Sequence, residues 1–338
     1  METGEAVGKH TFFGRKACVC RQKAVTLQAI NTTHDMYQMR NWLLVGALAL
    51  GLGGCGEQVS ELVILHTNDT HSQVEAKSDG RGGYAARMAV IEGIRAELSQ
   101  AGGETIGQAG GQQRAAADNI LLVDAGDFCQ GTPYFNFFHG RVEVDALNRM
   151  GYDAVTLGNH EFDNGIDTLA AVLREAQFAV VCANYDVSGT ALEGIVKPYT
   201  IVKKGGRKIG IFGLGVYPNN LIAAKNFAGI TYQAPYPIAQ QTADELRAKG
   251  CDLVVCLSHM GTYPDKPEDC CDTELVAQTR NIDIVIGGHT HKVYDNLRIR
   301  NLDGREIPVC QMGKSGLQIG KIVVHFEGKQ LQSAENLD

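Results

Sequence analysis

The residues of this sequence best suited to chemistry are histidines, carboxylates and one asparagine, and they gather in five short strings. The strings are Asp69-Thr70-His71, Gly126-Asp127, Gly158-Asn159-His160-Glu161 with Asp163 close behind, Ser258-His259, and Gly287-Gly288-His289-Thr290-His291. Five of the ten histidines of the chain fall in them. Such a mixture of nitrogen and oxygen donors suits Zn, Mn, Fe or Co better than Ca, which binds mostly oxygen.

Each string taken alone has a plainer interpretation. An isolated Asp-x-His is more often a turn with a surface histidine, and Gly126-Asp127 is by itself a turn signal. The spacing of His289 and His291, however, places both side chains on one side of an extended segment, because side-chain direction repeats every two residues. Five such strings in succession, each at the end of a predicted strand, favour one shared metal site over coincidence.

The elements that must position these strings alternate along the chain from residue 61 onward. Short apolar runs and amphipathic stretches predict a βαβ arrangement. The predicted strands are 62–66, 120–123, 154–157, 179–182, 209–214, 253–257 and 282–286, and the predicted helices are 84–98, 142–150, 166–176 and 238–249. The polar strings follow directly after strands, which is where open α/β sheets place their ligands.

Two regions of the chain do not follow this alternation of strands and helices. Residues 297–300, 307–310 and 322–326 predict antiparallel hairpins, with a turn at Asp303-Gly304. Residues 99–118 are rich in Gly, Gln and Ala and predict an exposed loop. No linker divides the region, so we expect a single large domain.

Four of the strings, at 64–72, 124–127, 158–163 and 287–291, resemble the motifs of calcineurin-like metallophosphoesterases. More closely, they are similar to the catalytic domain of the bacterial 5′-nucleotidase/UDP-sugar hydrolase/2′,3′-cyclic phosphodiesterase group. The resemblance runs from about residue 61 to residue 326. It implies an α/β fold, a four-layer α/β/β/α sandwich of two mixed sheets, with two divalent metal ions above the strands.

The resemblance also implies seven metal ligands drawn from carboxylates, histidines and an amide. They are Asp69, His71 and His291 for the first metal, Asp127 as a bridge to both, and Asn159, His259 and His289 for the second. By the same resemblance, His160 is a histidine that binds no metal and protonates the leaving group, and Asp163 orients it. The chemistry is consistent, since two nearby cations suit in-line attack on a phosphate ester and a positioned histidine can supply a proton. Cys129 also lies near the site, but we expect no metal role for it.

We therefore expect a phosphoric ester hydrolase that acts on small esters, with nucleotides as the leading class, of the 5′-nucleotidase or cyclic phosphodiesterase type. Two other functions stay open: a noncatalytic lipoprotein subunit that keeps the fold for binding, and a related hydrolase of sulfur-linked esters. The formal net charge of −7 argues against binding of a nucleic-acid polymer.

The amino-terminal region has the features of a secretory signal peptide. Arg40 precedes thirteen uncharged residues, 42–54, which is short of the roughly 20 that span a membrane and typical of a signal peptide. Leu52-Gly53-Gly54-Cys55 resembles a bacterial lipobox. We expect a protein anchored in the bacterial cell envelope through a lipidated Cys55, facing the periplasm or the outer membrane. The expected segments are 1–38, an unstructured or non-native extension; 39–54, the lipoprotein signal peptide; 55–60, a linker; and 61–338, the catalytic domain.

Recognition of the substrate poses a separate question. The nucleotidases of the resembled group carry a carboxyl-terminal domain that contacts the base and the phosphate, and we expect no room for it in this chain. Recognition is then expected from loops such as 128–139, or from a separately encoded domain of that type. The expected docking surface is the aromatic run Tyr134, Phe135, Phe137 and Phe138, with a buried loop anchor as the alternative.

Overall fold

The computed structural model describes residues 25–26, 60–101, 119–264, 266, 269–328 and 330–337. The predicted signal peptide, Cys55 and the linker up to residue 59 lie outside the described residues, as does the predicted loop from residue 102 to 118. Of the expected extension 1–38, only Val25–Thr26 is described; it forms strand β1, which pairs with β15. In the described part of the chain, no helix combines the length and the apolar character that crossing a membrane requires.

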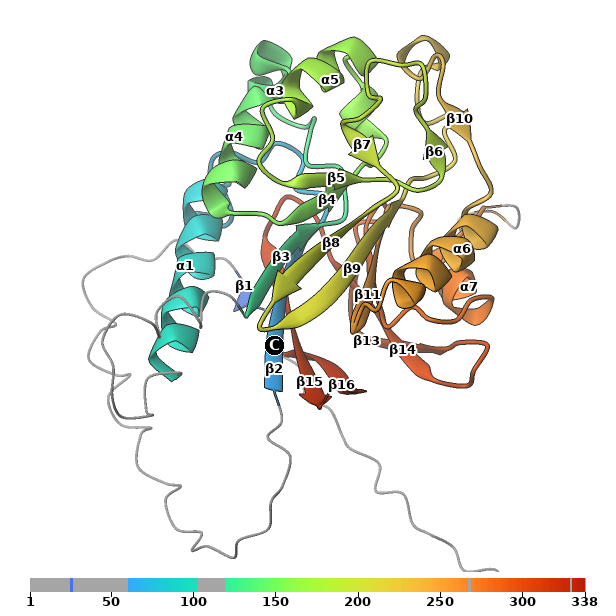
Figure 1. Cartoon of the computed structure of the whole chain (residues 1–338). Coiled ribbons are helices and arrows are strands. Elements are labelled where there is room, and N and C mark those ends of the chain that lie inside the picture. The colour runs from blue at the N-terminus through green and yellow to red at the C-terminus, as the bar shows by residue number, and fades with distance from the viewer. Residues whose placement is uncertain are drawn as a thin grey trace, which may run out of the picture.

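Two mixed β-sheets form the centre of the molecule (Figure 1). The first has eight strands in the order β1-β15-β2-β3-β4-β5-β7, with β16 paired to β15. Besides β1, its strands are β15 (Gln318–Glu327), β2 (Ser60–Thr67), β3 (Ile120–Asp124), β4 (Ala154–Thr156), β5 (Ala179–Val181), β7 (Val196–Lys197) and β16 (Gln330–Leu337). Strands β2 and β15, from opposite ends of the described chain, pair antiparallel.

The second sheet has six strands in the order β13-β14-β12-β11-β9-β8. They are β13 (Val293–Arg300), β14 (Glu306–Met312), β12 (Ile284–Gly287), β11 (Leu253–Ser258), β9 (Arg207–Leu214) and β8 (Tyr199–Lys204). A small two-stranded sheet of β6 (Tyr185–Asp186) and β10 (Thr231–Tyr232) lies apart from both.

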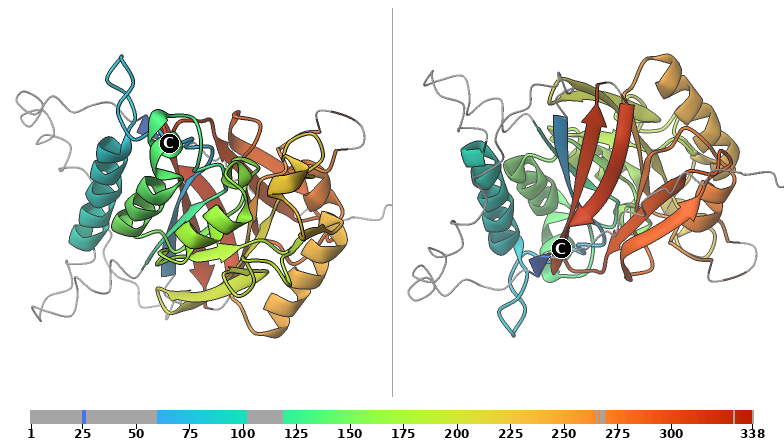
Figure 2. Two further views of the ribbon diagram at one scale, coloured as in Figure 1. Left: turned by 90° about the horizontal axis from the view of Figure 1, so that it is seen from above. Right: turned by 90° about the horizontal axis from the view of Figure 1, so that it is seen from below.

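Helices cover the outer faces of the two sheets (Figure 2). Those beside the first sheet are α1 (Tyr84–Ala101), α4 (Arg141–Met150) and α5 (Ile166–Leu173), and those beside the second are α6 (Pro235–Ala248) and α7 (Asp272–Ala277). Shorter turns of helix are α3 (Pro133–Phe138), η3 (His160–Phe162) and η4 (Ala224–Asn226). The predicted α/β/β/α sandwich is therefore confirmed.

Strand β2 shows why the sequence folds in this way. Its side chains alternate between two apolar environments: Leu62 and Ile64 face the core between the sheets, whereas Val63 and Leu65 face the core under the helices. Because successive side chains of a strand point to opposite faces, a run that is apolar at every position needs cover on both sides. A third core packs the second sheet against α6 and α7.

Most predicted elements are confirmed, with shifts of a few residues at their ends. Residues 99–101, predicted as loop, continue helix α1. The predicted hairpin of β13 and β14 is confirmed, and residues 322–326 also lie in an antiparallel hairpin, which β15 forms with β16. They belong to β15, which crosses to the first sheet because its apolar side chains, Phe326 among them, fill the core between the sheets. The half-buried edge strand β8 escaped prediction because its apolar pattern is weak.

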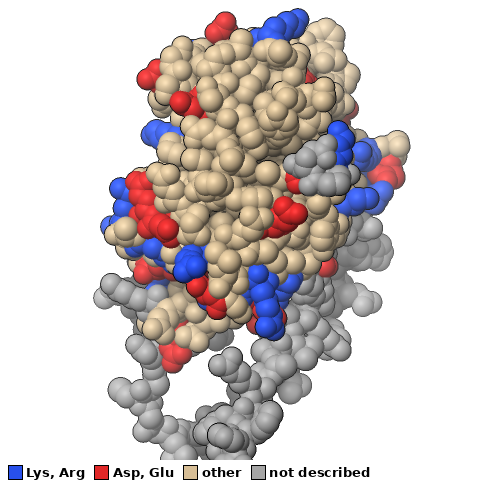
Figure 3. Space-filling model, turned by 90° about the vertical axis from the view of Figure 1, so that its right-hand side faces the viewer, with Lys and Arg blue, Asp and Glu red and all other residues tan. Residues whose placement is uncertain are grey.

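Charged residues are dispersed on the one face of the molecule that Figure 3 shows. On the face seen in Figure 3, acidic and basic side chains are interspersed, and the upper part of this face is mostly uncharged. No continuous basic strip of the kind used to bind a nucleic-acid polymer is visible on that face. The cysteines of the described residues are all free thiols.

Candidate active site

The carboxyl ends of five strands bring the predicted ligands together. In the first sheet β2, β3 and β4 run parallel, and in the second β11 and β12 do. The loops after the first three strands carry Asp69, His71, Asp127 and Asn159, and those after the other two carry His259, His289 and His291. Two groups result whose donor atoms lie within 4.8 Å of one another and could hold a metal ion: Asp69, His71 and His291, and Asp127, His259 and His289.

The first group has two imidazoles that face each other across a carboxylate. The Nε2 atoms of His71 and His291 lie 2.8 Å apart. Oδ1 of Asp69 lies 3.5 Å from Nε2 of His291 and 4.0 Å from Nε2 of His71. Asp69 is fully buried, and a buried carboxylate that faces two imidazole nitrogens is a donor set typical of a divalent transition metal.

The second group centres on His259, which is fully buried. Its Nδ1 lies 2.7 Å from the carbonyl oxygen of Ala125, which can only accept, so Nδ1 carries the hydrogen. This leaves the lone pair of Nε2 free to bind a metal, the orientation that metal-ligating histidines commonly have. That Nε2 lies 3.0 Å from Oδ2 of Asp127 and 3.9 Å from Oδ1 of Asp69, so the two groups adjoin. Beside them, Nδ1 of His289 lies 3.1 Å from Oδ1 of Asn159.

The buried carboxylates of this centre favour a positive charge beside them. Burial by itself lowers the pKa of His259, whereas the carboxylates of Asp127 and Asp69 raise it to about 10. Burial by itself raises the pKa of Asp127, but His259 outweighs it and holds that pKa below its usual range. A proton on His259 thus balances the carboxylates, and a divalent cation can take its place, since metal binding releases protons from its ligands. The donor set therefore fits divalent metal ions.

The backbone of the site is held in an uncommon conformation. Asp69, His71, Asp127, His289 and His291 all have φ between 46° and 75°, in the left-handed region that side chains other than glycine rarely adopt. Loop-to-loop hydrogen bonds hold three of them there: Asp69 N–H donates to Gly126 O, His71 N–H to Asp127 O, and His289 N–H to Asp69 Oδ1, at 2.9–3.0 Å. Such strain clusters at functional sites, where the surrounding structure over-determines it.

Gly158 lies against the second group. A methyl group built on its Cα would come within 2.2 Å of Oδ1 of Asp127 and 2.7 Å of Nε2 of His259. The position therefore requires glycine for close approach rather than for its φ.

A histidine–carboxylate pair stands beside the two groups. Nδ1 of His160 lies 2.8 Å from Oδ2 of Asp163, and both side chains are about one-third exposed. This contact raises the pKa of His160 against the effect of burial. The backbone N–H of His160 donates to Oδ1 of Asp127 at 2.9 Å, and its ring lies 5.4 Å from that of His71. The pair thus faces the metal site and leaves Nε2 of His160 available.

Two positioning residues were missed by the sequence analysis. Glu161 is buried and accepts hydrogen bonds from the backbone N–H groups of Asp127, Cys129 and Gly158, so it ties the loops after β3 and β4 together. Asn68 donates to Oδ2 of Asp69 at 2.6 Å and accepts from Met312 N–H at 2.8 Å, which links the two sheets. Glu161 belongs to the Gly-Asn-His-Glu string, so its place in that motif was the available signal.

Cys129 and the other histidines of the described residues are not members of the two groups. Cys129 is buried, and neither group includes it. His66 is buried within β2, and burial lowers its pKa to about 3. His139 caps helix α3, and His325 lies 3.8 Å from Glu61.

Comparison with known proteins adds the family. The family model described as calcineurin-like phosphoesterase matches residues 62–293, a span that contains all the candidate ligands. The chain is 31% identical over 296 residues to a snake venom 5′-nucleotidase of Gloydius brevicauda, covering 80% of this chain and 46% of that protein. It is 30% identical over 307 residues to the 5′-nucleotidase of Rattus norvegicus, covering 85% of this chain and 50% of that protein.

Comparison with solved structures also finds a 5′-nucleotidase. The 5′-nucleotidase precursor from Thermus thermophilus aligns with a TM-score of 0.67 and 31% identity, over 82% of this chain and 54% of that one. The chain thus spans about half the length of the relatives that it matches. These matches confirm the resemblance predicted from the sequence motifs.

Proposed function

Because the chain belongs to the calcineurin-like phosphoesterase family, whose members use two divalent metal ions, we propose that it hydrolyses small phosphate esters. Nucleotides are the leading substrate class, since the relatives that the chain matches are 5′-nucleotidases. The observation that carries the proposal is the pair of adjoining ligand groups with a histidine–carboxylate pair beside them.

The ligands divide between two metal sites. Asp69, His71 and His291 would hold one ion, and Asn159, His259 and His289 would hold the other. Asp127 would contact both, since a carboxylate has two acceptor oxygens. When bound, two such cations make a nucleophile available from water at neutral pH and neutralise charge on the phosphoryl oxygens.

The other steps belong to side chains of this protein. Asp163 accepts from Nδ1 of His160 and so fixes the orientation of the ring. Nε2 of His160 then faces the bound ester and donates its proton to the departing oxygen, which is general acid catalysis. A noncatalytic binding subunit would have no use for this pair, and the likeness to nucleotidases favours phosphate esters over sulfur-linked ones.

The test is metal-dependent hydrolysis of p-nitrophenyl phosphate. The protein is stripped with a chelator and assayed after addition of Zn, Mn or Co. We expect the stripped protein to be inactive and at least one of these ions to restore turnover. Activity in the stripped protein, or none with any divalent ion, would refute the proposal.

A partner domain is the second part of the proposal. We propose that a separately encoded domain of the nucleotidase carboxyl-terminal type docks on α3. Phe137 is 77% exposed and Phe138 is 49% exposed, whereas Phe135 is buried. The expected four-residue surface is thus corrected: Phe135 anchors the helix in the core. The segment before α3 contacts the first ligand group, because a methyl group on Gly131 would come within 2.6 Å of His71 O.

The docking proposal predicts a change in nucleotide affinity. Addition of the partner domain should lower KM for AMP in the wild type and not in Phe137→Ala/Phe138→Ala. Leu302→Ala is the matched control, since Leu302 is exposed to a similar degree in the β13–β14 turn. An equal response of all three proteins would contradict docking at α3.

The location of the protein is also a proposal. The signal-like segment 39–54 and Cys55 support a lipid-anchored protein of the bacterial cell envelope. Cys55→Ser should move the protein from the membrane fraction to the soluble one, and mass spectrometry of the amino-terminal peptide should find a diacylglycerol on wild-type Cys55. An unmodified Cys55 in membrane-free protein would contradict the anchor.

A further inference from the structure

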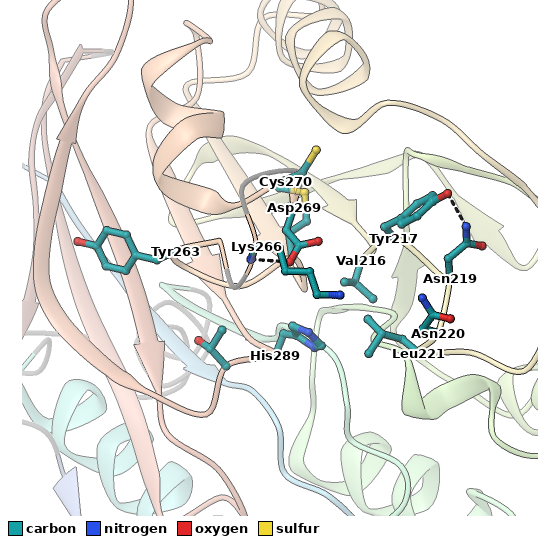
Figure 4. Close-up of a pocket in the computed structure, with 12 residues that line it drawn as sticks. Val216, Tyr217, Asn219, Asn220, Leu221, Tyr263, Lys266, Asp269, Cys270 and His289 are labelled. Carbon is teal, nitrogen blue, oxygen red and sulfur yellow. Dashed lines mark hydrogen bonds between the residues drawn. The ribbon is translucent and has the colours of Figure 1, made fainter.

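A pocket of about 150 Å³ opens beside the second ligand group (Figure 4). His289 and Thr290 form the part of its wall that adjoins the metal site. The loop after β9 and the segment after β11 supply the rest, which includes Val216, Tyr217, Asn219, Asn220, Met260 and Lys266. Its volume is about ten times what a single water needs and below the roughly 300–1,000 Å³ of pockets for drug-sized ligands. The pocket therefore suits one small group of a larger substrate.

The walls of this pocket combine apolar and polar surface. Val216 and Met260 are buried and form an apolar base. Asn219 and Asn220 add amides, each able to donate and accept hydrogen bonds. The ammonium group of Lys266 points into the space between His289 and Val216 (Figure 4). An apolar base with a few polar groups is typical of a ligand site.

Tyr217 is the most informative residue of the pocket. Its side chain is 48% exposed, yet it is held in place. The amide of Asn219 donates a hydrogen bond to the hydroxyl oxygen of Tyr217 at 2.6 Å. The rings of Tyr217 and Tyr232 pack edge to face, with their centroids 5.0 Å apart. The ring of Tyr232 in turn packs against that of the buried Tyr185, with the two ring centroids 6.2 Å apart. An exposed ring anchored to the core is a preorganised stacking platform, because little conformational freedom remains to be lost on binding.

The loop that carries the two amides is also constrained. Asn220 has φ of 64°, in the left-handed region, where a side chain other than glycine carries strain. Backbone N–H groups of Leu221 and Ile222 donate to Pro218 O at 3.1 and 2.9 Å and close the turn. Asparagine amides match the donor and acceptor edges of nucleobases, and aromatic rings stack on their faces.

We infer that this pocket binds the planar base of a nucleotide whose phosphate lies at the adjoining metal site; the inference rests on the proposed function. A second hollow, of about 740 Å³, shares Tyr217 but has no histidine in its wall. Since the phosphate is fixed among the histidines, the pocket that includes His289 is the one within reach of the base. The chain would then recognise part of the nucleoside without a partner domain.

The experiment compares three esters on the full chain loaded with Mn²⁺: AMP, ribose 5-phosphate and p-nitrophenyl phosphate. The wild type should have a lower KM for AMP than for ribose 5-phosphate. Tyr217→Ala should raise KM for AMP about 5- to 30-fold, the lower part of the range for loss of one stacking contact. KM for ribose 5-phosphate should change far less. Tyr217→Phe keeps the ring and should retain the preference for AMP.

The control is Leu302→Ala. Leu302 is 53% exposed in the turn between β13 and β14 and does not line the pocket. We expect this variant to keep the preference for AMP. As a second measurement, adenosine should inhibit hydrolysis of p-nitrophenyl phosphate less strongly in Tyr217→Ala than in the wild type, with unfolding temperatures compared to exclude misfolding.

The two hypotheses fail in different ways. Absence of hydrolysis of all three esters with any divalent ion would refute the proposed function. Hydrolysis with equal KM for AMP and ribose 5-phosphate, or an unchanged KM for AMP in Tyr217→Ala, would overturn the pocket inference and leave the phosphoesterase proposal intact.

Discussion

Adding a single methyl group at Gly158 would disturb the metal site without removing any ligand. The φ of Gly158 lies outside the left-handed range, so the backbone tolerates alanine. The new Cβ would stand 2.2 Å from Oδ1 of Asp127 and 2.7 Å from Nε2 of His259, and real Cβ atoms essentially never come within 3.0 Å of such neighbours. Asp127 must therefore move by roughly 1 Å to restore van der Waals contact.

The expected loss follows from that displacement. Overpacking of a dense interior costs about 1–3 kcal/mol of folding free energy, and a misplacement of about 1 Å can reduce catalysis by about 10²-fold. We expect Gly158→Ala to remain folded, to bind less metal per chain, and to lose about two orders of magnitude in kcat/KM for p-nitrophenyl phosphate.

The assay measures three quantities: metal content by mass spectrometry after gel filtration, kcat/KM, and the unfolding temperature. Gly93→Ala is the matched control. Gly93 lies in helix α1 with nothing within 4 Å of its built Cβ, so alanine should stabilise the protein by about 0.5–1 kcal/mol through helix propensity. Full metal content and full activity in Gly158→Ala would show that Asp127 and His259 do not form the metal site.

Three further substitutions test the separate roles. His160→Ala should keep its metal and lose about 10²–10⁴-fold in turnover, the range for a positioned general acid; loss of metal in this variant would show that His160 is a ligand. Asp127→Ala should bind less than two metal ions per chain, because the carboxylate shared by both sites is gone; two ions with normal affinity would contradict the ligand set. Glu161→Gln should lower the unfolding free energy by about 1–3 kcal/mol, since an amide N–H₂ would face a backbone N–H and leave it unsatisfied. An unchanged denaturation midpoint would show that these hydrogen bonds do not hold the loops.

The sequence alone determined the family and the layer architecture. The signals for both are local: the motif strings carry the resemblance that implies the four layers, and residues 62–65 of strand β2 are all apolar and therefore need cover on both faces. Gly158-Asn159-His160-Glu161 is likewise a contiguous string that can be read without knowledge of contacts. The pairing of His160 with Asp163, which the resemblance implied, is also a local contact between residues three positions apart.

The tertiary structure alone decided which strand completes which sheet. Residues 322–326 carry a strand pattern that predicts a hairpin, which β15 forms with β16, but only the core between the sheets selects β2 as the second partner of β15. Register and partner depend on surfaces more than 200 residues apart, and no local pattern encodes them. The same holds for Phe135 and Phe137: both are aromatic residues of one short helix, but packing buries the first and exposes the second.

The geometry of the site was likewise beyond the sequence. Asp69 and His291 come from different sheets, and their distance of 3.5 Å is set by how the two sheets pack. The left-handed backbone at five candidate ligands is not a preference of Asp or His; at three of them, hydrogen bonds between neighbouring loops hold it in place. The pocket beside His289 is formed by the loops after β9, β11 and β12, so its shape arises only when all three strands take their places in the second sheet. Residue types and spacing therefore identify which chemistry the chain carries, whereas long-range packing decides where each donor atom lies and what can bind beside it.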